Sequence, residues 1–198
     1  LGPLTRGRAR ATRVDAARYK LAHSHRLEAQ RILTTLSSAL PQAVEAELKA
    51  ARLEHLRSAM AAYDQVRQNL DAADASRLTE LERIFLRNAC FYVGDCAYEL
   101  GDYARAIAAY DAAALKYADD PASLVALVQI VGAYVAQGQL AQARTANERA
   151  RRQLARFPDE AWSRPDLPME KKHWERWLDA RGVLERGESA NATGGGAP

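Results

Sequence analysis

The stretch LGDYARAIAAYDAAALKYADDP, residues 100–121, decides the fold of this 198-residue chain. Its pattern recurs within residues 130–160, because Gly101 and Gly138 lie 37 residues apart in similar surroundings. Each glycine follows a run of helix-forming residues. Each precedes a polar residue, an apolar residue, two further residues and an alanine, Ala106 or Ala143. Two helices repeated at this period predict an all-α solenoid of stacked helical hairpins.

The residue types around each glycine suit two antiparallel helices. Glycine readily adopts the left-handed backbone conformation that ends the first helix and starts the turn. Small side chains are needed where the two helices cross closely, and we expect Ala106 and Ala143 there. Tyr110 lies one turn further on and should fill the space towards the next hairpin. Because a single hairpin leaves one apolar face bare, neighbouring hairpins must stack to bury it.

Apolar periodicity, proline and glycine divide the chain into helices. We expect these helices at about 15–40, 42–70, 76–100, 103–117, 122–137, 140–156 and 169–184. Asp74 or Ser76 is the expected N-cap of the third helix. The predicted parts are a basic flexible arm at 1–13, a first hairpin with long helices at 14–72, two repeats at 76–158, a loop and capping helix at 159–186, and a flexible tail at 187–198.

The first of the two repeats closely resembles the tetratricopeptide repeat. The matching positions are Gly94, Gly101, Asp102, Tyr103, Ala106, Ile107, Tyr110 and Ala113. Cys90, Ala97 and Ala118 replace the aromatic residue, the tyrosine and the proline usual in that family. The second repeat matches at Ile130, Ala133, Tyr134, Gly138, Leu140, Ala143 and Ala150.

The long first hairpin looks like a degenerate unit of the same kind. The whole arrangement is similar to multi-hairpin tetratricopeptide proteins of planctomycete bacteria, which end in a tryptophan-bearing helix. The resemblance implies an α-solenoid of about three antiparallel hairpins with a C-terminal capping helix.

The resemblance also implies a partner-binding face, because ligands of tetratricopeptide arrays usually lie on the concave side lined by the first helix of each hairpin. The register assigns to it Phe91, Tyr92, Asp95, Tyr98, Glu99, Val128, Gln129, Gly132, Val135 and Ala136, with Tyr19 and His23 from the first hairpin. This face is apolar and aromatic with a little negative charge. It suits an extended peptide or an amphipathic helix with a basic flank.

Phe91 and Asp95 replace the lysine and asparagine with which some family members clamp a C-terminal carboxylate, so no chaperone-tail binding of that kind is implied. In the alternative interpretation the aromatic residues are ordinary core, buried by neighbouring hairpins or by the last helix. Trp174 and Trp177 of that helix would then cap the array, or would reach into its groove.

Motifs for catalysis or metal binding are missing from the sequence. We find no phosphate-binding glycine loop, no HExxH pair, no paired-cysteine zinc spacing and no nucleophile elbow. His23 and His25 are two residues apart and face different ways on a helix, whereas His55 and His173 are isolated in the sequence. Cys90 and Cys96 also point apart around a helix. We therefore predict no catalytic, cofactor-binding or metal-binding residue, no cofactor and no enzyme activity.

The net charge of +3 is unevenly distributed. Residues 1–31 carry eight basic residues against Asp15 and Glu28, which makes this segment +6 and the remainder −3. A solvated leader to the first helix explains this better than nucleic-acid or lipid binding, because no aromatic residue interleaves the first five arginines. No run approaches the roughly 20 apolar residues of a membrane span. We expect membrane contact only through a segment upstream of Leu1, and the compartment, bacterial cytoplasm or cell envelope, stays open.

These features predict a non-enzymatic scaffold or adaptor that binds a protein or peptide within a larger bacterial assembly. One alternative is a structural or assembly subunit of a membrane-anchored envelope protein. Another is a nucleic-acid-associated protein that uses the basic arm. Because short arrays often pair with themselves, a homo-oligomer is also among the expected assemblies.

Overall fold

The computed structural model describes residues 3–165 and 167–180, with side chains from residue 12 onwards. Throughout these residues the chain is helical apart from turns and loops, and no strand is present in them. The all-α prediction is therefore confirmed. The chain divides into two compact units, residues 1–109 and residues 110–198. The predicted flexible tail at 187–198 lies outside the described residues.

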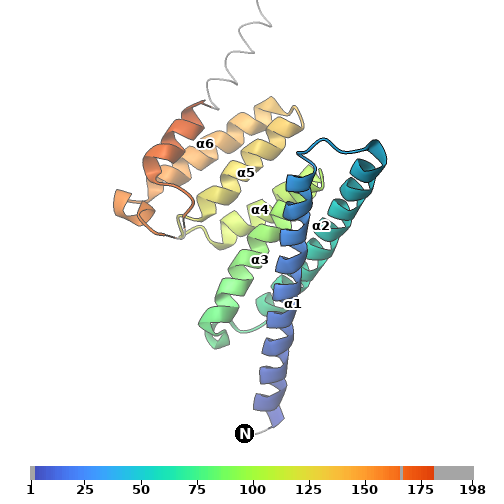
Figure 1. Ribbon diagram of the computed structural model, residues 1–198. Helices are drawn as coiled ribbons and strands as arrows, with labels where there is room; N and C mark the ends of the chain where they lie inside the picture. The colour runs from blue at the N-terminus through green and yellow to red at the C-terminus, as the bar shows by residue number, and fades with distance from the viewer. Residues whose placement is uncertain (1–2, 166, 181–198) are drawn as a thin grey trace, which may run out of the picture. The chain divides into compact units, whose positions relative to one another are not determined.

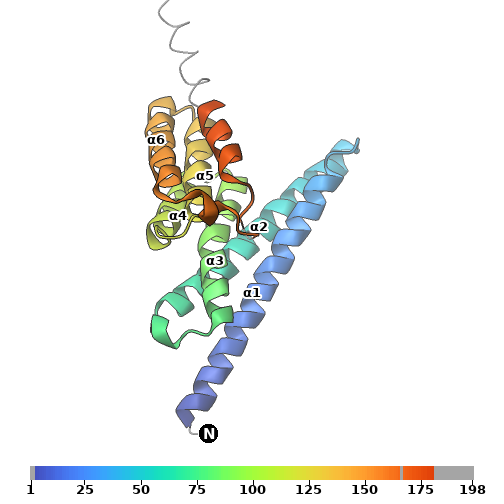
Figure 2. The same cartoon turned by 90° about the vertical axis from the view of Figure 1, so that its left-hand side faces the viewer.

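The first unit begins with a long antiparallel hairpin. Its helices are α1 (Pro3–Thr35) and α2 (Gln42–Asp71), which run side by side in both Figure 1 and Figure 2. Fully buried alanines such as Ala22 and Ala59 leave room for close packing of α1 and α2. Helix α1 begins much earlier than predicted, so residues 3–13, which we expected to form a flexible arm, are helical.

Helix α3 (Glu80–Glu99) packs against α1 and α2 and starts later than predicted. Of the two expected caps, Ser76 lies within a short 3-10 helix, η1 (Ala75–Arg77), and Asp74 caps the start of that helix by accepting a hydrogen bond from the Ser76 amide. Thr79 is the actual N-cap of α3. Asp74, Ser76 and Thr79 are all small polar residues of the type that favours helix starts, so residue type alone did not identify the cap of α3. Helix α4 (Tyr103–Lys116) follows after Gly101.

The second unit contains an antiparallel pair, α5 (Ser123–Ala136) and α6 (Leu140–Arg156). Helix α5 is apolar around most of its circumference and is buried on several sides, as expected for a helix covered by more than one neighbour. A 3-10 turn, η2 (Asp159–Trp162), leads to a last helix at 171–180. That helix buries Trp174 and Leu178, and the predicted helix residues beyond 180 lie outside the described part of the chain.

The helix at 171–180 is joined to α6 by polar contacts at Leu178. The side-chain amide of Asn147 and the guanidinium of Arg151 both donate to the carbonyl oxygen of Leu178, each at 3.2 Å. These hydrogen bonds connect the backbone of the last helix to two side chains of α6, and so they fix this helix against α6.

Helices α3 and α5 end in the same way. Gly101 and Gly138 have φ values of +77° and +70°. The amide of the residue after each glycine donates back to the carbonyl five residues earlier, Asp102 to Ala97 and Gln139 to Tyr134, both at 2.9 Å. This is the Schellman arrangement, in which glycine is preferred because the backbone is left-handed. The predicted role of both glycines in ending these helices is confirmed.

Candidate functional site

Two reciprocal hydrogen bonds define the start of α3, the helix that carries most of the predicted binding face. The Thr79 hydroxyl accepts from the Glu82 amide at 3.2 Å, and the Glu82 carboxylate accepts from the Thr79 amide at 2.7 Å. Thr12 of α1 donates to the other carboxylate oxygen of Glu82 at 2.7 Å. The buried Glu82 is thus fully bonded, and it ties the first turn of α3 to α1.

Three of the residues predicted to bind a partner contact α1 and α2 of the same chain. The Arg26 guanidinium lies 4.1 Å above the Tyr92 ring and donates to Asp95 at 3.1 Å. Glu99 accepts a hydrogen bond from Arg52 of α2. The first hairpin therefore occupies the part of α3 on which we expected a partner. These contacts agree with the alternative interpretation, in which a neighbouring hairpin covers the part of α3 that carries Tyr92, Asp95 and Glu99.

Aromatic packing continues from this contact into the core of the first unit. Tyr19 stacks on Phe85 with ring centroids 4.3 Å apart and meets Tyr63 edge-on at 5.5 Å. Its hydroxyl accepts from the Asn88 side chain at 3.1 Å. Tyr19, which the resemblance placed on the binding face, is therefore a packing residue between α1 and α3.

Burial shapes the electrostatics of this cluster. It raises the pKa of the Tyr63 hydroxyl, and it raises the pKa of the Cys96 thiol to about 12. Burial alone would lower the pKa of Arg26, but the Asp95 carboxylate and the neighbouring tyrosines outweigh it, so that the pKa is raised. Cys96 is therefore a neutral thiol at neutral pH and lacks the thiolate that a nucleophilic cysteine needs.

Phe91 and Tyr98 are the remaining predicted residues on α3. They lie seven residues apart, two helical turns along one side of the helix, and both are half-buried. Tyr98 meets Tyr103 of α4 edge-on at 5.2 Å. Both rings retain exposed surface, in contrast to the fully buried Tyr63.

The predicted residues on α5 differ in their exposure. Val128 is buried and is a core residue of the second unit. Gln129 and Val135 are partly exposed and lie on either side of Gly132. A partner could reach Gln129 and Val135 but not Val128.

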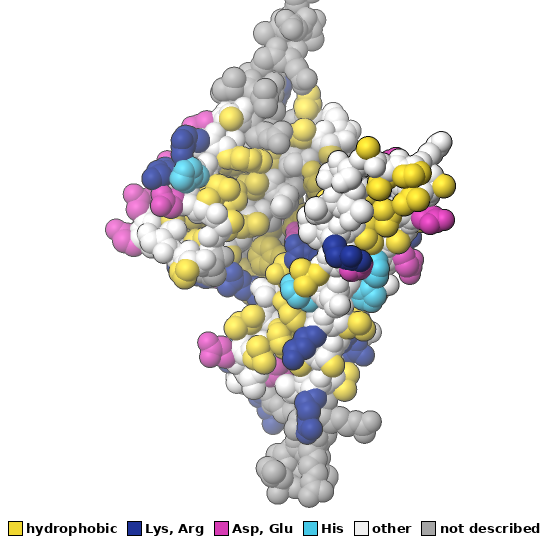
Figure 3. Space-filling model, viewed as in Figure 1, with side chains coloured by type: hydrophobic (Ala, Val, Ile, Leu, Met, Phe, Trp, Pro, Cys, Tyr) yellow, Lys and Arg dark blue, Asp and Glu magenta, His cyan; other side chains and the backbone are white. Residues whose placement is uncertain are grey.

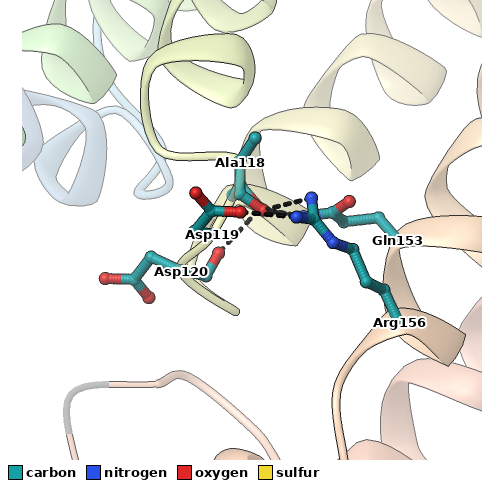
Figure 4. A network of polar contacts seen from close by, with 6 residues as sticks. Ala118, Asp119, Asp120, Gln153 and Arg156 are labelled. Carbon is teal, nitrogen blue, oxygen red and sulfur yellow. Dashed lines mark hydrogen bonds and ion pairs between the residues drawn. The ribbon is translucent and has the colours of Figure 1, made fainter.

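The sequence Asp119-Asp120-Pro121 forms a bonded turn before α5 (Figure 4). Gln153 of α6 donates to the Ala118 carbonyl at 2.7 Å, and Arg156 donates to the Asp119 carboxylate at 2.5 Å. The Asp120 carboxylate accepts from the Ala122 amide at 2.9 Å. Such side chain to backbone bonds start a helix and hold the turn against α6, so these paired carboxylates have a structural role.

A shallow groove of about 420 Å³ lies between α6 and the last helix. Most of its charged lining is already paired, because Arg151 bonds Asp179 at 2.7 Å and Lys171 bonds Asp159 at 2.6 Å. Ligand pockets typically combine an apolar wall with a few convergent polar groups. The paired charges here serve the packing of the last helix.

One close contact between α1 and α2 was not predicted. The Nδ1 atoms of His25 and His55 are 2.9 Å apart. His23, in contrast, lies 3.5 Å from the Tyr63 hydroxyl through its own Nδ1. Figure 3 shows histidine atoms at the surface over α1 and α2. The signal available in the sequence was the hairpin itself, because His25 and His55 stand at equal distances on either side of Leu40.

The turn end of the α1–α2 hairpin carries exposed apolar side chains, including Leu33 and Val44. Within the described residues, no group of three or more histidine, cysteine, aspartate or glutamate side chains could hold a metal ion. None of the helices seen in those residues has both the length and the hydropathy of a bilayer span.

The geometry therefore distinguishes residues that hold the fold together from residues that a partner could reach. Tyr92, Asp95, Glu99 and Val128 belong to the first group, whereas Gln129 and Val135, with the outer surfaces of Phe91 and Tyr98, belong to the second. No protein-family model matches the chain, and no curated protein is significantly similar to it.

Proposed function

We propose that this chain is a non-enzymatic scaffold of tetratricopeptide-type helical hairpins whose role is to bind another protein. The observation that carries the proposal is the duplicated turn. Two helices 37 residues apart end in the same glycine-closed cap, with matching hydrogen bonds and a second helix following each. A repeated two-helix unit is typical of proteins that present an extended surface to a partner.

The side chains that follow each glycine support the repeat. Ala106 and Ala143 are both fully buried, as small residues at a close helix crossing would be. Tyr110 and Asn147 occupy the next equivalent position and are also buried. The burial pattern of the two second helices therefore repeats at the spacing of the glycines.

The elements on either side of the two repeats differ from the repeats themselves. The first hairpin has longer helices than the units that follow, as a degenerate first unit would. The last helix buries Trp174 and Leu178 and exposes His173, Glu175 and Arg176. Terminal elements with a polar outer face protect the open end of a helical array from solvent.

The partner-binding residues we propose are Phe91 and Tyr98 on α3 in the first unit and, separately, Gln129 and Val135 on α5 in the second unit, all of which are partly exposed. Tyr92, Asp95 and Glu99 are better explained as the residues that dock α1 and α2. A partner in the form of an extended peptide or an amphipathic helix would cover aromatic and aliphatic surface of this kind.

A pull-down from the lysate of the source organism tests both the role and the surface. Wild-type chain, a Phe91→Ala/Tyr98→Ala variant and a Leu115→Ala control would be immobilised and the captured proteins identified. Leu115 lies on α4 and is 73% exposed, so the control removes apolar surface elsewhere. We expect the control to retain the wild-type partners and the double variant to lose them.

Two outcomes would contradict the proposal. Equal capture by the double variant and the wild type would reject the α3 surface, and wild-type chain that captures no specific protein would reject the scaffold role. Circular dichroism of all three proteins shows whether a loss of binding reflects a loss of helix.

A further inference from the structure

The imidazoles of His25 and His55 face each other nitrogen to nitrogen across the α1–α2 hairpin. Their Nδ1 atoms are 2.9 Å apart, and their ring centroids are 5.2 Å apart. At that distance one Nδ1 carries the shared proton and the other presents its lone pair. Both side chains are half-buried, so ions in solution reach the pair.

The charges around the pair are balanced. On α1, Arg31 donates to Glu28 at 3.0 Å, and Arg26 is paired with Asp95. The pKa of Glu28 is lowered by the hydrogen bond from Arg31 and, more weakly, by the charges of Arg31 and His55.

On α2, Arg52 is paired with Glu99, and Arg57 lies 3.7 Å from Glu54. Each neighbouring arginine on the two helices thus has a carboxylate beside it, and one of those carboxylates, Glu28, interacts with His55 itself. These ion pairs limit the repulsion that an added cation would meet.

We infer that His25 and His55 form a two-histidine site for a borderline divalent transition-metal ion such as Zn²⁺, Ni²⁺ or Cu²⁺. Imidazole nitrogen is a preferred ligand for these ions, whereas Mg²⁺ and Ca²⁺ prefer oxygen ligands. The ion takes the place of the shared proton. That proton moves through water to the Nε2 atom of its own ring, so both rings stay neutral and both Nδ1 lone pairs face the metal.

The required movement is small. Two imidazoles on a tetrahedral zinc ion, with Zn–N bonds of about 2.0–2.1 Å, have their ligating nitrogens about 3.3 Å apart. Half-exposed side chains on two separate helices reach that spacing by small rotations. Because no third protein ligand is present among the described residues, water completes the coordination and the site is open.

The site has a structural consequence, because its two ligands come from different helices. An ion bound only when α1 and α2 are paired stabilises the paired state by mass action. Occupancy would therefore strengthen the long hairpin that covers α3, independently of the protein-binding role proposed above.

Calorimetric titration of the untagged 198-residue chain with Zn²⁺ and Ni²⁺ tests the inference. We expect one ion per chain, and no binding of Mg²⁺ under the same conditions. His25→Asn and His55→Asn should each weaken binding about tenfold or more, because the second ligand of a pair binds at high effective concentration. His23→Asn is the matched control on the same helix and should bind as the wild type does. Ni²⁺ should raise the melting temperature of the wild type and of His23→Asn, but not that of His25→Asn.

Binding that survives His25→Asn or His55→Asn unchanged would overturn the site, as would the absence of Zn²⁺ binding to the wild type. Zinc titration followed by NMR of the wild-type histidine rings gives a reading that does not depend on the variants folding. The ring signals of His25 and His55 should shift together, and a shift confined to His23 or His173 would contradict the assignment.

Discussion

Arg26 connects α1 to α3 through two contacts of its guanidinium, one with an aromatic ring and one with a carboxylate. It covers the Tyr92 ring and donates to the Asp95 carboxylate, with side-chain exposures of 30% for Arg26 and 23% for Asp95. Arg57 and Glu54 make an ion pair at 3.7 Å within α2 alone, with exposures of 59% and 73%. Partly buried charge pairs and cation–π contacts contribute more than exposed pairs, which contribute little.

Arg26→Ala should lower the free energy of unfolding by about 1–2 kcal/mol, because it leaves Asp95 partly buried without its partner. Arg57→Ala is the control, and its effect should stay within about 0.5 kcal/mol. Urea unfolding of each variant measures both values. A double-mutant cycle of Arg26→Ala and Asp95→Ala should give a clear coupling energy, and a coupling near zero would show that this contact does not hold α1 to α3.

The ends of α3 and α5 are the turns on which the proposed hairpins depend. Gly101 and Gly138 both have positive φ, and an added Cβ at either position would meet no atom within 4 Å. The requirement for glycine is therefore one of backbone conformation and not of space. Alanine is strained in the left-handed region, whereas asparagine tolerates it better.

Stability at each of these positions should fall in the order glycine, asparagine, alanine. Alanine should cost about 1–2 kcal/mol at both sites, since the two backbones are alike. Thermal or urea unfolding of the four single variants gives the ranking. If alanine proved as stable as glycine at Gly101 or Gly138, that turn would not be left-handed in solution.

At the scale of the whole molecule, most helix bounds next to glycine or proline were predictable, although α1 ends at Thr35, five residues before its predicted end at 40. The predicted bounds of α6 agree with the structure, and those of α2, α4 and α5 differ by a residue at most at either end. The start of α1 was missed, because residues 3–13 show no apolar face even though alanine, leucine and arginine are good helix formers.

The binding face was harder to predict than the helices. The positions of its residues around α3 were predicted from the repeat pattern of one hairpin. That pattern does not indicate which other helices pack on α3. The contact of Arg26 with Asp95 joins residues 69 apart, and no local pattern encodes it. The His25–His55 pair needed both the hairpin turn and the rotation of each helix about its axis. The position of the α1–α2 turn could be predicted from Pro41, whereas the rotation of each helix about its axis depends on side-chain packing.

The claim on which the account depends most is that α3–α4 and α5–α6 are two copies of one hairpin unit. Backbone NMR assignment of the intact chain measures this directly. We expect helical chemical shifts over 80–99, 103–116, 123–136 and 140–156, interrupted at Gly101 and Gly138 by positive φ angles. Continuous helical shifts through either glycine, or extended-strand shifts between residues 80 and 156, would contradict the claim.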